Sequence, residues 1–416
     1  MKPRISLKSI SAGFAALRHR NFRLFFIGQC ISLIGTWMQN LGQSWLVLEM
    51  THSAFKLSLV TMLQFLPMML FSLFAGTIVD RFPKRKILLI TQTCMMILAF
   101  ALAALTYFNV VEYWHILVLA SLLGLVNTID MPTRQSYFND LVGKEDLMNA
   151  IALNSSMFNL ARIVGPAIAG FLISLVGIAI CFTLNGLSFV AVLIGLWMIN
   201  VGNESPLTPK IESTKQVIDD IKEGLHYINR HTLIKLPLLL LALVNLIGMN
   251  YSVLMPLFAT AILKQDAAGL GLIMSAMGMG SFTGAMIVAM NSKSGPSLRY
   301  IYIASVVTSL LMLILGLERN FFIACVTLYM IGLASSVFVA LVTSIIQLNA
   351  KNVMRGRVMS VYSLVFGGFM PIGSLLTGGL TEWLGISMCM IVSGGMSVLS
   401  ALGAIAWLKP KIETMP

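Results

Sequence analysis

Three ionisable side chains interrupt long apolar segments of this chain and are the first candidates for chemistry. Asp130 and Arg134 lie four residues apart, so on a helix they share one face and can form an ion pair. Pro132 lies between them and removes one backbone hydrogen bond from that helix. Arg162 precedes a Gly-Pro step at 165–166 in the next apolar segment. If these segments lie in a membrane, each charge is costly and indicates a functional role.

No enzyme motif accompanies these residues. The sequence contains no Gly-x-x-x-x-Gly-Lys-Ser/Thr phosphate loop and no His-Glu-x-x-His zinc motif. The five cysteines lie in apolar segments without a Cys-x-x-Cys pair, which argues against a disulfide framework or a metal site. The five histidines lie near the ends of apolar segments or between them, where we interpret them as solvated. We therefore predict no enzymatic activity, no metal and no cofactor.

The elements that must position the charges are membrane-spanning helices. Of the 416 residues, 57% are hydrophobic and 11% are charged, whereas soluble domains carry about 25% charged residues. A spanning helix needs about 20 apolar residues. Segments of that length are expected near 22–48, 55–79, 87–108, 114–136, 150–175, 178–199, 236–262, 268–290, 299–317, 321–345, 358–382 and 386–408. The predicted fold class is an all-α membrane protein with twelve transmembrane helices.

The longest hydrophilic stretch divides these segments into six and six. It begins with a turn-rich run at 202–206 and continues with apolar residues at helical spacing. We interpret that part as an amphipathic helix on the membrane surface, with either a plain linking role or a regulatory one. The expected domains are an N-terminal six-helix bundle at 1–200, a cytoplasmic linker at 201–235 and a C-terminal six-helix bundle at 236–416.

The distribution of Lys and Arg predicts the orientation. With the N-terminus in the cytoplasm, 24 of the 28 Lys and Arg residues fall on the cytoplasmic side, three fall outside and Arg162 lies within a span. This bias follows the positive-inside rule and predicts that both termini are cytoplasmic. The net charge of +12 is then a feature of topology, so nucleic acid is not an expected partner. We expect a multi-pass protein of the plasma (inner) membrane.

A short motif follows the second expected span. It reads Gly76-Thr-Ile-Val-Asp80-Arg81-Phe-Pro-Lys84-Arg85-Lys86. This motif resembles the loop signature of major facilitator transporters, Gly-x-x-x-Asp-Arg-x-x-Arg-Arg-Lys, with Pro83 at a position where that family commonly has a turn residue such as Gly. A gate suits these residues, because Asp80 can neutralise a basic side chain and the basic run resists translocation. A loop that only sets topology is the alternative. The corresponding region of the second half, 284–299, lacks the Asp-Arg pair.

Spans four and five extend the resemblance. They carry, in order, Asp130-Met-Pro-Thr-Arg134-Gln135, Asn149-Ala150 and Arg162-Ile-Val-Gly165-Pro166 with Gly170 beyond. This order is similar to the branch of the superfamily that exports drugs, macrolides and siderophores such as enterobactin. The resemblance implies a monomeric secondary transporter that works by alternating access and expels amphipathic small molecules. It implies the proton gradient as the energy source, and a small-molecule substrate and the lipid bilayer as partners.

The resemblance and the buried charges together suggest a gate. We expect Asp80, Asp130, Arg134 and Arg162 to hold one end of the transport path shut, although Asp130 and Arg134 could instead be a static pair. Asp130 is the leading candidate for proton coupling, because Glu49 and Glu382 lie at outer span ends where solvation is expected. The gate and coupling candidates are Gly76, Asp80, Arg81, Lys84, Arg85, Asp130, Arg134, Arg162, Gly165 and Pro166.

The resemblance also implies a central cavity lined mainly by spans one, four, seven and ten. The polar and aromatic candidates there are Trp37, Asn40, Gln43, Asn127, Asn245, Asn250, Tyr251, Ser335 and Ser336. Such side chains often only bridge helices, which is the alternative for each of them. For the whole chain the alternatives are uptake or lysophospholipid-type flipping on the same fold, a non-transporting membrane sensor and a membrane enzyme.

Overall fold

The computed structural model describes residues 14–199, 214–247, 250–291 and 295–413; at 73–74, 76–77, 80, 214–220, 352–353 and 408–413 it describes the backbone alone. The first half comprises η1 (Ala15–Arg18), α2 (Arg20–Thr51), α3 (Ala54–Arg81), α4 (Lys84–Tyr107), α5 (Tyr113–Val176) and α6 (Ala179–Met198). The second half comprises α8 (Thr232–Ile247), α9 (Tyr251–Leu257), η2 (Phe258–Ile262), α10 (Ala267–Met290), α11 (Leu298–Leu317), α12 (Phe321–Asn349), α13 (Asn352–Gly368), α14 (Met370–Leu384) and α15 (Ile386–Glu413). Helix α7 (Thr214–Arg230) lies between the halves in sequence.

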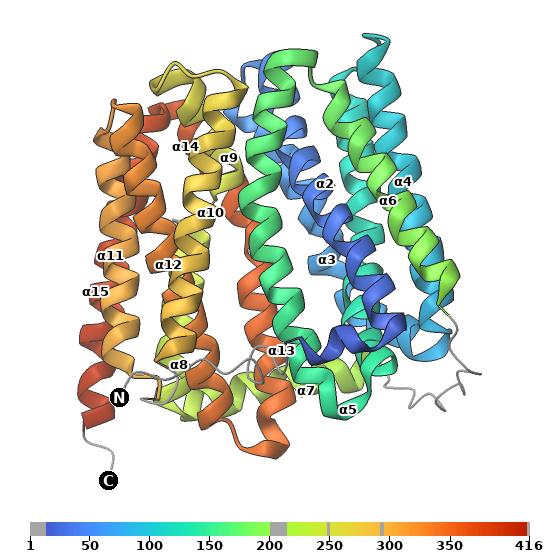
Figure 1. The fold of residues 1–416 in the computed structure, drawn as a ribbon. Coiled ribbons are helices and arrows are strands. Elements are labelled where there is room, and N and C mark those ends of the chain that lie inside the picture. Colours follow the sequence, from blue (N-terminus) through green and yellow to red (C-terminus); the bar gives the residue numbers. More distant parts are fainter. Residues whose placement is uncertain (1–13, 200–213, 248–249, 292–294, 414–416) are drawn as a thin grey trace, which may run out of the picture.

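The helices form two groups that stand side by side (Figure 1). Helices α2–α6, in blue to green, form one group, and α8–α15, in yellow to red, form the other. Helix α7 runs across the lower end of the molecule and packs on α13, where Arg357 pairs with Glu223 at 2.7 Å. The predicted amphipathic helix within 201–235 therefore exists, and it is docked on the second half of the chain. We call the lower end of the molecule in Figure 1 the α7 end and the opposite one the far end.

Helix α5 contains two membrane-length segments joined at a glycine. It is 64 residues long, about 96 Å if straight, or three times the hydrocarbon thickness of a bilayer. Gly143 interrupts it with φ 71° and ψ −179°, a backbone conformation that is essentially restricted to glycine. The chain turns back at this residue near the α7 end (Figure 1). The two spans predicted at 114–136 and 150–175 thus lie on the two arms of α5.

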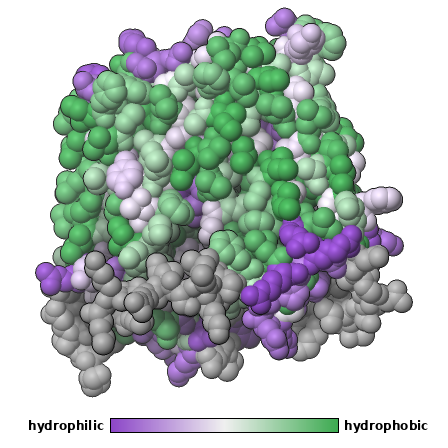
Figure 2. Space-filling model, viewed as in Figure 1, coloured by the Kyte–Doolittle hydropathy of each residue, from purple (hydrophilic) through white to green (hydrophobic). Residues whose placement is uncertain are grey.

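Ten helices or helix runs in the described ranges are long and apolar enough to cross a membrane. This number neither confirms nor contradicts the predicted twelve spans. The two spans predicted on α5 count as one helix, and α2 is not among the ten. On the face shown in Figure 2, a broad apolar belt covers the middle of the molecule, with hydrophilic residues at both ends. The belt has the distribution expected where the surrounding solvent is lipid.

The structure divides one predicted span and changes the helical register within another. The span expected at 358–382 is divided at Phe369 into α13 and α14, with Pro371 in the first turn of α14. In the span expected at 236–262, α9 passes into the π-helical η2 two residues after Pro256. Proline lacks the amide hydrogen that a helix interior requires, and both features lie next to a proline.

The two halves meet along two seams, in which α5 packs against α10 and α3 packs against α14. Glycines allow close backbone contact in the first seam. A Cβ added at Gly271 would collide with the carbonyl oxygen of Pro166, and one at Gly170 would collide with that of Ala267. Small residues are what membrane helices use to approach closely. The Gly-Pro step noted in the sequence is therefore part of the interface between the halves.

Candidate functional site

One face of α2 carries polar side chains along most of its length. The residues of this face are Gln29, Ser32, Thr36, Gln39, Asn40 and Gln43, each buried or half-buried. Their spacing of three or four residues places them in one stripe, about 21 Å long, on the helix. We call this row the α2 stripe. It lowers the hydropathy of α2, which explains why this helix is not among the ten apolar candidates.

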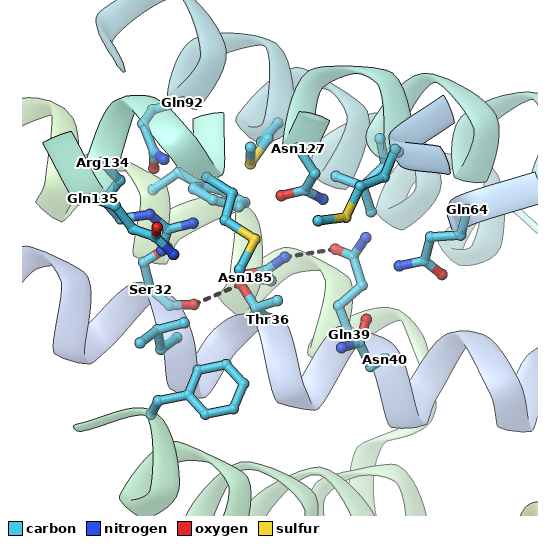
Figure 3. A pocket seen from close by; sticks show the side chains of 18 of the residues that line it. Ser32, Thr36, Gln39, Asn40, Gln64, Gln92, Asn127, Arg134, Gln135 and Asn185 are labelled. Atoms are coloured by element: carbon cyan, nitrogen blue, oxygen red, sulfur yellow. Dashed lines mark hydrogen bonds between the residues drawn. The ribbon is translucent and has the colours of Figure 1, made fainter. Parts of the chain in front are cut away.

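A cavity of about 280 Å³ lies beside the α2 stripe, and all of its lining comes from α2 to α6. Its polar lining consists of Ser32, Thr36, Gln39, Asn40, Gln64, Gln92, Asn127, Arg134, Gln135, Asn154 and Asn185. Aromatic and methionine side chains complete the wall, among them Phe65, Met68, Met95 and Phe158. Figure 3 shows the side chains of α2 facing Gln92, Asn127 and Gln64 across this space. The lining can offer many hydrogen bonds and carries one charge, that of Arg134.

An amide pair at the base of the cavity is held in a fixed orientation. Asn185 of α6 donates from Nδ2 to Oε1 of Gln39 at 2.7 Å (Figure 3). The Oδ1 of Asn185 accepts from the hydroxyl of Ser188 at 3.2 Å. Gly35 leaves room for the Asn185 and Ser188 side chains. A Cβ at residue 35 would clash with them, at 2.6 Å from the Ser188 hydroxyl oxygen and 2.7 Å from Asn185 Oδ1. The free amide hydrogens of Gln39 are thereby directed away from Asn185.

Asp130 is the centre of a buried polar network behind the cavity wall. Its side chain is fully buried and accepts hydrogen bonds from Thr91 Oγ1 at 2.7 Å and from Gln92 Nε2 at 2.9 Å. Its second oxygen forms an ion pair with Arg134 Nη2 at 2.8 Å. Arg134 also donates from Nη1 to Gln29 Oε1 at 2.9 Å. The predicted pair thus forms, and it links the α2 stripe to α4 and α5.

The basic run after α3 makes contacts within the first half. Lys84 Nζ pairs with Asp140 of α5 at 2.8 Å. Arg85 donates to the carbonyl oxygens of Leu196 and Trp197 at 2.7 and 2.8 Å, which caps the end of α6. A cation at a helix C-terminus is favourable because the last carbonyl groups lack helical partners. Arg81 is exposed, and the side chains of Gly76 and Asp80 lie outside the described part.

The structure does not join Arg162 to the network of Asp130. Arg162 Nη2 donates to Asn159 Oδ1 at 3.1 Å, within its own helix. Its neighbours Gly165 and Pro166 are buried in the seams of α5 with α2 and α10, where a Cβ on Gly165 would lie 2.5 Å from that of Trp37. The gate of Asp80, Asp130, Arg134 and Arg162 therefore remains a prediction. Of these four residues, the structure brings Asp130 and Arg134 into contact.

The cavity candidates of the second half lie apart from this cavity. Asn245 contacts the carbonyl oxygen of Phe366 at 3.4 Å. Asn250 is buried, and its amide nitrogen has no hydrogen-bond partner among the described residues. The side chains of Tyr251 and Ser335 lie close enough to interact with each other. Ser336 is half-buried on α12. In the first half, Asn40 and Asn127 line the cavity, whereas Gln43 and Trp37 lie outside its lining.

Sequence reasoning missed most of the cavity lining on α3, α4 and α6. Gln92 lies in a short polar run, Thr91-Gln92-Thr93, and Asn185 lies in an apolar segment; neither belongs to a row of polar residues at helical spacing. Gln39, by contrast, belongs to the α2 stripe, and a search of the first span for polar residues at helical spacing would have found it.

Carboxylates join the two halves at the far end. Glu382 of α14 accepts hydrogen bonds from the Ser53 hydroxyl and from the Phe55 backbone amide, each at 3.2 Å. In the other seam Asp266, the N-cap residue of α10, accepts from the hydroxyl of Ser174 on α5 at 3.3 Å. Glu382 was expected to be merely solvated, whereas the structure places it in a contact between the halves.

This architecture is shared with solved transporters. A bacterial homologue of the human lysosomal transporter Spinster, in an inward-facing and unoccupied conformation, superposes with a TM-score of 0.73 at 11% identity, over 94% of this chain and 97% of that one. A D-xylose–proton symporter superposes with a TM-score of 0.70 at 13% identity, over 94% of this chain and 96% of that one. At these identities the likeness shows a shared fold, that of two helical bundles which meet at two seams.

Sequence comparison narrows this fold class to a family. Residues 11–415 match the family described as transmembrane secretion effector, and the chain belongs to it. The staphyloferrin A transporter of Staphylococcus aureus is 27% identical, over 92% of each chain. Macrolide efflux protein A of Streptococcus pyogenes is 21% identical, over 92% of this chain and 96% of that one. The multidrug efflux pump Tap of Mycobacterium tuberculosis is 27% identical, over 87% of each. The predicted superfamily and its exporter branch are confirmed.

Proposed function

We propose that this transporter exports amphipathic small molecules from the cytoplasm in exchange for protons. In this proposal the α7 end and both termini face the cytoplasm of a plasma (inner) membrane, as the positive-inside distribution of Lys and Arg suggests. The relatives are named for transport of staphyloferrin A and for efflux of macrolides and of several drugs. Export of drug-like or siderophore-like solutes is the corresponding activity for this chain.

The observation that carries the proposal is the position of Asp130. Among the described side chains it is the carboxylate that is fully buried, and Arg134 lies between it and the cavity. Protonation of Asp130 would remove the charge that holds Arg134, and the freed guanidinium would then rearrange toward the cavity. A proton on Asp130 and a substrate in the cavity would thus both act on Arg134 and compete with each other. Exchange of substrate for protons requires such competition.

Transport by reconstituted protein tests the proposal. Proteoliposomes with an imposed pH gradient are assayed for accumulation of rhodamine 123, a cationic xanthene dye, and of fluorescein, an anionic one. We expect wild-type protein to accumulate at least one dye. Asp130→Asn should abolish gradient-driven accumulation and retain exchange of the same dye without a gradient. Glu145→Gln removes a carboxylate that is exposed at the α7 end, and it should behave like the wild type.

Two results would contradict the proposal. Gradient-driven accumulation by Asp130→Asn at the wild-type rate would remove this carboxylate from coupling. Absence of flux of either dye in the wild type, with correctly folded protein, would favour the non-transporting alternative.

A further inference from the structure

Arg162 is a positive charge in the membrane region to which no described side chain supplies a counter-ion. The described structure gives its guanidinium one hydrogen bond, to the neutral side chain of Asn159, and leaves Nε buried without a partner. No ion pair joins it to a carboxylate, in contrast to Arg134, which Asp130 neutralises at 2.8 Å. A charge at membrane depth without a partner is destabilising, and such a residue indicates a functional site.

The helix geometry directs Arg162 toward the interior of the protein. On the second arm of α5, Leu160, Ile168, Phe171 and Leu175 are exposed and form the lipid-facing side. Arg162 follows Leu160 by two residues, a rotation of about 200° around the helix axis, and so lies on the opposite face. Asn154 and Phe158, at four-residue intervals before it, both line the cavity. Arg162 is not itself a lining residue of the cavity; it lies one turn beyond Phe158 on the same face of α5.

The surroundings of this face suit an aromatic or otherwise apolar group beside the charge. The ring of Phe158 packs against that of Trp37 with centroids 5.8 Å apart, in an edge-to-face arrangement. The α2 stripe supplies neutral hydrogen-bonding groups beyond them. Among the described lining residues of the cavity there is no Asp or Glu, because Asp130 lies behind the wall. This site lacks the accessible carboxylate that a cationic ligand would require.

We propose that Arg162 binds an oxyanion, such as a carboxylate, on the transported solute, and that the protein therefore selects anionic over cationic amphipathic molecules. The guanidinium offers a planar pair of donors that matches a carboxylate. Phe158 and Trp37 contact the apolar part of the solute, and the amides of the α2 stripe bind its neutral polar groups. This assignment rests on the proposed transport function and specifies its substrate class.

Binding of the two xanthene dyes to the purified protein tests this selectivity, because they share a ring system and differ in charge. Fluorescence anisotropy should show tighter binding of fluorescein than of rhodamine 123. Arg162→Gln should weaken fluorescein binding by about tenfold or more, as expected for loss of a charge-assisted hydrogen bond. It should leave rhodamine 123 unchanged or bound more tightly. Arg162→Lys should restore part of the affinity for fluorescein, and Arg319→Gln, at an exposed arginine, should have no effect.

A stability measurement separates a ligand-binding role from a structural one. Without ligand, Arg162→Gln should leave the thermal unfolding midpoint unchanged or higher, because it removes an uncompensated charge. Arg134→Gln should lower the midpoint, because it leaves Asp130 buried without its cation. An equal loss of stability in both variants would overturn the proposal.

Lipid composition distinguishes a solute from a lipid headgroup as the source of the oxyanion. In nanodiscs, fluorescein affinity should be the same in phosphatidylcholine and phosphatidylglycerol. Competition by phosphatidylglycerol that disappears in Arg162→Gln would assign the site to lipid and overturn the proposal. Absence of fluorescein binding, or a wild-type preference for rhodamine 123, would also overturn it. If the wild type shows either of these binding results and also shows gradient-driven flux of rhodamine 123, the proposed transport function stands and the selectivity for anions is excluded.

Discussion

At the scale of single residues, the chemistry of this protein depends on how each buried charge is balanced. Asp130 has three donors from three residues, and the cation among them, Arg134, also contacts the α2 stripe. Spacing in the sequence predicted the Asp130–Arg134 pair, because residues four apart on a helix must meet. Thr91 and Gln92 could not be predicted, since a contact between helices depends on their packing and leaves no local pattern.

The contribution of Thr91 can be measured against a matched threonine on the same helix. Thr91→Val removes a donor to the buried carboxylate and should lower the free energy of unfolding by about 1–3 kcal/mol. Thr93 bonds instead to the carbonyl oxygen of Leu89 in its own helix, at 2.7 Å. Thr93→Val should therefore have little effect. Thermal unfolding in detergent measures both variants, and equal midpoints would show that the Thr91 bond contributes nothing.

At the scale of helices, close packing across the seams determines where the halves can touch. The sequence predicted most helices because their apolar runs are long, and it placed Gly165 and Pro166 among the gate candidates, whereas the structure places them in packed seams. It did not predict the π-helical turn after α9 or the division between α13 and α14, since proline is also tolerated within membrane helices when neighbouring groups satisfy the freed carbonyls.

One methyl group in the α5–α10 seam should disturb this contact. Gly271→Ala places a Cβ against the Pro166 carbonyl oxygen, and overpacking of this kind costs about 1–3 kcal/mol. Thermal unfolding and dye transport should both decline. The control is Gly379→Ala on α14, where no atom lies within 4 Å of the added Cβ. Wild-type stability and transport of Gly271→Ala would show that the seam can separate without cost.

At the scale of the whole molecule, the contacts of Glu382 and Asp266 hold the two halves together at the far end. Alternating access requires that such contacts break when the transport path opens on that side. The predicted topology of six spans, linker and six spans anticipated two bodies that can move relative to each other. The sequence could not identify the carboxylates at the contact between the two halves. An acidic residue at the end of a span looks the same in the sequence whether it is solvated or bonded to the other half.

Loss of the Glu382 contact should increase exposure of the cavity from the far end. Thr36 lines the cavity and can be replaced by cysteine in a protein whose five native cysteines have been removed. Adding Glu382→Gln weakens the acceptor of two hydrogen bonds and should raise the labelling rate by an impermeant thiol reagent several-fold in intact cells. Glu49→Gln, an exposed carboxylate of α2, is the control. Identical labelling in all three proteins would exclude Glu382 as a closing contact.

The α2 stripe has a consequence for how the protein is made. Synthesis delivers α2 before the helices whose amides complete its hydrogen bonds, and Asn185, the partner of Gln39, follows 146 residues later. Unpaired amides make a nascent helix a poor substrate for insertion into lipid. The hydrogen bond between Gln39 and Asn185 can therefore form only after α6 has been synthesised, so the first bundle completes its polar core late.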